Sequence, residues 1–181
     1  NIRCPPPTES LTLDQLPRIR TRRLIYPDEK SEFPRVLAND NRIPAGKLIN
    51  KVLTLHLEIV WSDFYPETEN RPGLMVITIR EKGKAPSIPA PLIRIETGTK
   101  IKAILHNTLK DSSASFWGLQ KRPSFVNESI HLKPGETKEI NFESGEAGTY
   151  LYKVKLGDHN QINEEQQLGG AFIIDPKRAS P

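Results

Sequence analysis

The sequence contains one cysteine, Cys4, among its 181 residues, so no disulfide can form within the chain. It has one methionine, Met75, and no apolar run approaching the roughly 20 residues of a membrane-spanning helix. No signal-peptide pattern stands at its start. These shortages exclude a disulfide-stapled scaffold and predict a chain without a membrane span.

Motifs of catalysis and nucleotide binding are missing as well. The sequence has no G-x-S-x-G, no P-loop, no G-x-G-x-x-G and no H-E-x-x-H. None of its four histidines is paired with another at a spacing of two or four residues, so no local metal chelate is visible. The residues by themselves therefore predict no assembled active site.

The positive charges do not gather into a nucleic-acid patch. The net charge is +4, and acidic and basic residues are mixed along the chain, with RTRR at 20–23 as the one dense basic run. No zinc-finger, helix-turn-helix or RNP-type pattern accompanies that run. We therefore expect no nucleic-acid partner.

Two regions differ in composition. Residues 1–47 are rich in proline and arginine and predict an extended arm. We expect this arm to pack on the body, residues 48–181, through Leu24, Ile25, Phe33 and Leu37. The body forms the second predicted domain.

The body reads as short strands separated by turn residues. Residues 52–60 alternate strictly between apolar and polar, which is typical of a half-buried strand. Further strands are predicted at 74–81, 92–96, 100–109, around 115–119, 129–143, 148–156 and 169–176, with 129–143 forming a hairpin at its Lys-Pro-Gly-Glu turn. A proline-broken connection covers 84–91, and a polar loop covers 157–168. The pattern predicts an all-β fold, an antiparallel Greek-key β-sandwich.

Several stretches together resemble a known family. Four stretches are similar, in the same order, to segments of a cupredoxin (plastocyanin-like) domain of multicopper oxidases: PAPLIRIETGTKIKAILHNTL, HLKPGETKEINF, GTYLYKV and QLGGAFIIDP. The segment before them resembles the one that precedes this domain in a bacterial branch of the multicopper oxidases: NDNRIPAGKLINKVLTLHLEIVWSDFYPE. The likeness runs from Ala38 to Pro176. It implies the N-terminal domain of an exported bacterial oxidase, located in the periplasm or outside the cell.

The resemblance also implies where copper ligands would stand. In that family, two H-x-H pairs of this domain hold part of a trinuclear copper cluster. Here the pairs fall on Ser115 and Trp117, and on Lys153 and Lys155. A hydroxyl is a poor copper ligand, an indole offers only an N–H donor, and two ammonium groups would repel the cation. The Cys, His and Met set of a blue-copper site is also missing, so we expect no metal and no cofactor in this chain.

The expected function is therefore structural. We expect a copper-free domain of a multicopper oxidase-like protein, with copper and any oxidase activity in other domains of a longer parent chain. Its partners would be further cupredoxin domains or a second copy. Trp117 would fill the space of the metal as a core or interface aromatic. The alternative is a stand-alone binding module with a site near Trp117, Lys153 and Lys155, and a third possibility is an oxidase of unusual ligation. Whether the protein is an enzyme stays open.

Overall fold

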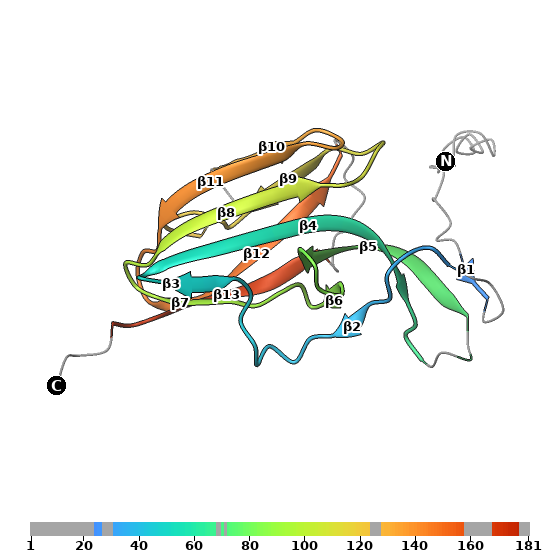
Figure 1. The fold of residues 1–181 in the computed structure, drawn as a ribbon, viewed down its shortest axis with the longest axis horizontal. Helices are drawn as coiled ribbons and strands as arrows, with labels where there is room; N and C mark the ends of the chain where they lie inside the picture. The colour runs from blue at the N-terminus through green and yellow to red at the C-terminus, as the bar shows by residue number, and fades with distance from the viewer. Residues whose placement is uncertain are drawn as a thin grey trace, which may run out of the picture.

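A computed structural model describes residues 24–26, 31–67, 70, 72–123, 128–157 and 168–177. Outside these ranges lie Cys4, the RTRR run and most of the polar loop 157–168, including His159, Glu164 and Glu165. The described residues form two β-sheets that face one another (Figure 1). They contain no helix long and apolar enough to cross a membrane. The prediction of an all-β sandwich is confirmed.

The first sheet has eight strands in the order β11-β8-β4-β5-β6-β2, with β1 beside β5 and β3 beside β4. Their bounds are β1 Leu24–Ile25, β2 Leu37–Ala38, β3 Lys47–Ile49, β4 Val52–Phe64, β5 Gly73–Glu81, β6 Ser87–Ile88, β8 Lys100–Asn107 and β11 Thr137–Glu143. The second sheet has the order β10-β9-β12-β13-β7. Its strands are β7 Ile93–Glu96, β9 Ala114–Trp117, β10 Ser129–Leu132, β12 Gly148–Leu156 and β13 Gly169–Asp175.

The long strand β4 organises the first sheet. It runs four residues beyond the predicted end and pairs with β8 in parallel and with β5 in antiparallel register. Leu53, Leu55, Leu57 and Ile59 point to one side and are each at most 2% exposed. This row forms one wall of the core, as the alternating sequence predicted.

The core between the sheets is closed by large side chains of the second sheet. Phe116, Tyr152 and Phe172 are fully buried there. The Tyr152 hydroxyl donates a hydrogen bond of 2.6 Å to the carbonyl oxygen of Pro91, so its polar end is satisfied. Burial also raises the pKa of Tyr152, which therefore remains protonated at physiological pH.

The predicted hairpin at 129–143 is wrong. The turn is present, since Lys133 and Glu136 are linked by a 3.1 Å main-chain hydrogen bond and a 2.7 Å bond from the Lys133 amide to the Glu136 carboxylate. The strands on either side of it, however, belong to different sheets, because β10 pairs with β9 and β11 pairs with β8. The turn carries the chain from one layer of the sandwich to the other.

The sheets are mixed, whereas the sequence predicted an antiparallel sandwich. β4 with β8, β13 with β7, and β2 with β6 are parallel pairs. Parallel neighbours need a crossover connection, and here other strands of the sandwich provide it. The proline-broken connection at 84–91 contributes the short strand β6.

The described part of the N-terminal region contributes strands to the first sheet. β1 pairs with β5, and β2 pairs with β6. Ile25 is 4% exposed, whereas Leu24, Phe33 and Leu37 remain 39–53% exposed. Of the four residues expected to pack on the body, Ile25 is buried, and the other three are exposed.

Gly118 allows the second sheet to close around β9. Its φ is +83°, and a Cβ atom at this position would lie 2.4 Å from the main-chain oxygen of Leu151. Gly83 has nearly the same φ, +80°, but open space around it. Substituting each glycine by alanine therefore distinguishes two free-energy costs: a left-handed backbone at both positions, and a steric clash at Gly118 alone.

We expect Gly118→Ala to destabilise the protein more than Gly83→Ala does. The left-handed conformation costs each variant about 1–2 kcal/mol, and the clash with β12 adds about 1–3 kcal/mol to the first variant. Urea unfolding of both variants measures the difference. Equal losses of unfolding free energy would contradict the close approach between β9 and β12.

Candidate functional site

The residues singled out by the sequence lie together on the outer face of the second sheet. In the antiparallel register of β9 and β12, Trp117 stands opposite Lys153 and Ser115 opposite Lys155. Phe116, between Ser115 and Trp117, is buried in the core. Because side chains alternate along strands, the four selected side chains share the opposite, outward face.

Trp117 is an outer-face residue rather than part of the core between the sheets. Its side chain is half-buried, and Phe116 supplies the core aromatic of β9. The indole Nε1 is shielded from water and has no hydrogen-bond partner within the described ranges. Trp117 therefore does not belong to the core between the sheets.

β10 adds a histidine that sequence reasoning missed. His131 stands opposite Ser115, and its Nδ1 lies 3.2 Å from the Ser115 hydroxyl oxygen. The carbonyl oxygen of His131 accepts a 2.6 Å hydrogen bond from the Lys138 ammonium group. The sequence predicted that 129–132 would pair with 137–143, so the neighbourhood of His131 could not be identified.

Toward β13, the same outer face carries small and apolar residues. Gly169 of β13 stands opposite Lys153, and Ala171 stands opposite Leu151. Leu151 is 58% exposed although it lies on the central strand of the sheet. Small residues beside an exposed leucine and an indole give a surface that another protein can approach closely.

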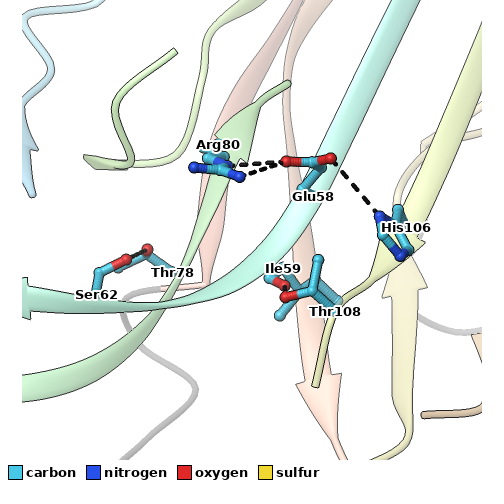
Figure 2. A network of polar contacts seen from close by, with 7 residues as sticks. All are labelled: Glu58, Ile59, Ser62, Thr78, Arg80, His106 and Thr108. Atoms are coloured by element: carbon cyan, nitrogen blue, oxygen red, sulfur yellow. Dashed lines mark hydrogen bonds and ion pairs between the residues drawn. The ribbon is translucent and has the colours of Figure 1, made fainter. Parts of the chain in front are cut away.

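A second polar cluster, also missed from the sequence, lies on the outer face of the first sheet (Figure 2). The Glu58 side chain is only 7% exposed. Its Oε2 accepts a hydrogen bond of 2.9 Å from Arg80 Nε and lies 2.8 Å from Arg80 Nη2 in an ion pair. Its Oε1 lies 3.6 Å from His106 Nδ1. The cation of Arg80 offsets the cost of burying this carboxylate.

Hydroxyl groups beside this cluster satisfy one another or the main chain. Ser62 and Thr78 share a 2.6 Å hydrogen bond, and both are fully buried. Thr108 donates a 2.6 Å bond to the carbonyl oxygen of Ile59 (Figure 2). The hydroxyl groups of Ser62, Thr78 and Thr108 therefore all have hydrogen-bond partners, which is typical of a structural network.

His56 is the exception on this face. Its Nε2 is buried and finds no hydrogen-bond partner in the described part of the chain. Burial is the main cause that lowers its pKa, and the positive charge of Lys82 lowers it further. His56 is therefore held in its neutral form to a lower pH than a histidine in water.

Comparison with known proteins gives a family match. The multicopper oxidase pattern matches residues 80–179. A protein of Kuenenia stuttgartiensis, described as a probable nitrite reductase-hydroxylamine oxidoreductase fusion protein, is 26% identical over 109 residues. That match covers 55% of this chain and 13% of the Kuenenia protein. The chain thus spans a small part of that relative.

Solved structures show the same fold. A multicopper oxidase from Campylobacter jejuni, described as a metallo-oxidase, matches with a TM-score of 0.52 and 22% identity, over 88% of this chain and 33% of the oxidase. A laccase from Pediococcus acidilactici matches with a TM-score of 0.50 and 17% identity, over 84% of this chain and 32% of the laccase. The predicted cupredoxin-like sandwich is therefore confirmed.

The residues on the outer face of β9 and β12 do not fit a copper cluster. Copper sites use imidazole or thiolate donors, whereas this face offers a hydroxyl, an indole N–H and two lysines. His131 is the one imidazole on the face among the described residues. Nowhere in the described ranges do three or more His, Cys, Asp or Glu side chains gather in a way that could hold a metal.

We expect Glu58→Gln to lower the free energy of unfolding by about 2–4 kcal/mol, because Arg80 loses the charge that compensates it in a partly buried site. Glu139→Gln is the matched control, since Glu139 pairs with Lys102 at 3.0 Å while both side chains stay 45% exposed. The control should cost at most about 1 kcal/mol. Similar urea midpoints for the two variants would contradict a structural role of the buried pair.

We expect the stability of the protein to fall as the pH drops below 6.5. The folded state lowers the pKa of His56, so the unfolded chain takes up the proton first and gains from acidification. His56→Gln should make the free energy of unfolding less dependent on pH between 7.5 and 5.5. Urea titrations at both pH values measure this slope, and an unchanged slope in the variant would rule out His56 as a contributor.

Proposed function

The chain belongs to the multicopper oxidase family, and we propose that it serves this family as a structural domain without a copper site. The observation that carries the proposal is the register of β9 and β12. It places Trp117 opposite Lys153 and Ser115 opposite Lys155, at the positions where the family resemblance implies four histidines. Two ammonium groups, one hydroxyl and one indole replace the imidazole donors that copper needs.

Oxidase chemistry, in this proposal, depends on copper sites outside the chain. The chain spans 33% of the Campylobacter oxidase and 13% of the Kuenenia fusion protein, which supports a longer parent with further domains. The family resemblance favours an exported protein, in the periplasm or outside the cell. The role of this domain is to hold the shape of the parent and to present an interface.

The interface is the outer face of the second sheet. Leu151 is exposed on its central strand, and the half-buried indole of Trp117 lies on the neighbouring strand. Tryptophan is among the residues that contribute most of the energy of protein–protein contacts, and burial of the exposed Leu151 would add apolar contact area. A further cupredoxin domain, or a second copy of this chain, is the proposed partner.

A second candidate function is a binding module whose ligand stacks on Trp117. It is favoured by the partial exposure of the indole and by the two lysines beside it. An anionic ligand with a flat ring or sugar would suit an indole face next to ammonium groups. Trp117→Phe should then weaken ligand binding without unfolding the chain, whereas the structural role predicts no small-molecule ligand.

Copper analysis tests the structural proposal. After incubation with copper and removal of the excess by a chelator, we expect the purified chain to retain far less than one equivalent of metal. The matched variant carries Ser115→His, Trp117→His, Lys153→His and Lys155→His, and it should retain more copper because imidazoles replace the unsuitable groups. Mass spectrometry of the metal content provides the measurement for both.

Two results would overturn the proposal. Stoichiometric copper in the unmodified chain would show that the present residues form a metal site. Oxygen consumption by the copper-treated chain with phenolic or metal-ion substrates would show an oxidase of unusual ligation. Thermal unfolding of the four-histidine variant checks that it remains folded.

A further inference from the structure

We infer that the end of the first sheet formed by the β3–β4 hairpin binds an anionic lipid surface. This basic hairpin end consists of Lys47, Ile49, Lys51, Val52 and Lys100. It lies on the opposite sheet from Trp117 and is independent of the proposed function. The features that carry the inference are the exposure of its aliphatic side chains, the surplus of lysines and the shape of the surface between them.

The hairpin presents aliphatic side chains to water. Leu48 is 55% exposed, Ile49 52% and Val52 37%. Ile49 stands directly opposite Val52, so these two side chains form a pair on one face. Packing within the described sandwich accounts for neither of them, because the core takes Leu53 and Leu55 from the same strand.

A tight turn fixes these side chains at the end of the sandwich. Asn50 and Lys51 connect β3 to β4 with φ values of +48° and +61°, as in a two-residue hairpin turn of type I′. The carbonyl oxygen of Lys51 accepts a 3.0 Å hydrogen bond from the Lys100 amide, which holds the turn against the start of β8. A rigid tip loses little entropy when it enters a membrane interface.

Lysines surround the aliphatic pair. Lys100 is the neighbour of Val52 in the parallel register of β4 and β8, and Lys47 stands opposite Thr54. No ion pair of the Lys47, Lys51 or Lys100 side chains occurs within the described residues.

Acidic residues offset only part of this charge. Lys102, the next lysine on β8, is paired with Glu139, and Glu143 stands opposite Lys100. Among the three lysines of the hairpin end, Lys102 and these two glutamates, positive charges outnumber negative ones by four to two. The surface has the charge that anionic lipids attract.

The combination favours a lipid surface over a soluble anion. Aliphatic side chains enter the boundary between headgroups and acyl chains, while ammonium groups remain at the level of the phosphates. A hollow of about 370 Å³ beside the pair, lined by Val52, Lys100, Lys102, Asn141 and Glu143 among others, provides room for a headgroup. A soluble anion would use the lysines but would leave Ile49 and Val52 in water.

Sedimentation with vesicles tests the inference. The 181-residue chain should bind vesicles of phosphatidylcholine mixed with phosphatidylglycerol, and it should bind phosphatidylcholine alone at least tenfold more weakly. Each lysine near an anionic surface strengthens binding about fivefold. Lys47→Gln with Lys100→Gln should therefore weaken binding about 25-fold. Sodium chloride at about 0.5 M should largely abolish binding, because salt screens the attraction between lysines and lipid phosphates.

Two pairs of variants give the contrast. Ile49→Ser with Val52→Ser should weaken binding at least tenfold. Leu24→Ser with Leu37→Ser, which changes two aliphatic residues of similar exposure on β1 and β2, should not change it. Lys121→Gln with Lys133→Gln removes the same charge from exposed positions elsewhere and should have less than a threefold effect. Thermal unfolding confirms that each variant is folded.

Three outcomes would overturn the inference. The first is no binding to anionic vesicles, and the second is equal binding to anionic and neutral vesicles. The third is an equal loss of vesicle affinity in the hairpin variants and their controls. The last outcome would mean that net charge or another face is responsible. Binding lost only in the hairpin variants would support the basic hairpin end as the site.

Discussion

The alternation of side chains along β4 is the constraint on which the rest of the structure depends. One side of this strand supplies the leucine row of the core, and the other side carries the buried side chains of Glu58 and Ser62 with their hydrogen-bond partners. A shift of one residue would exchange these two sides, placing a carboxylate in the core and leucines against Arg80. Since β4 pairs with β3, β5 and β8, its register also sets the positions of these neighbours.

The second sheet belongs to a cupredoxin-like sandwich, but the four residues selected on its outer face do not have the chemistry of copper ligands. The register of β9 and β12 brings two residues of each strand together on one face, and Gly118 allows the strands to approach closely. None of the four residues supplies the donors that copper requires. The same scaffold can therefore serve a different purpose, because fold and site are set by separate groups of side chains.

Much of the fold could be predicted from the sequence because strands such as 52–60 alternate clearly between apolar and polar residues. The resemblance to family motifs of known order also led us to expect Lys153 and Lys155 near Trp117, whereas their register came from the structure. Sheet membership could not be predicted around 133–136, since a turn between two strands looks alike in a hairpin and in a crossover between layers. His131 and the Glu58–Arg80–His106 cluster depend on such long-range pairing, so local pattern gave no sign of them.

The crossover at 133–136 has a mechanical consequence. It joins β10, an edge strand of one sheet, to β11, an edge strand of the other, and Lys138 bridges back to the carbonyl oxygen of His131. Pulling either edge strand away from its sheet therefore transmits force through a short connection to the other layer. Because the edge strands β10 and β11 are joined by this short turn, local unfolding of one is expected to involve the other.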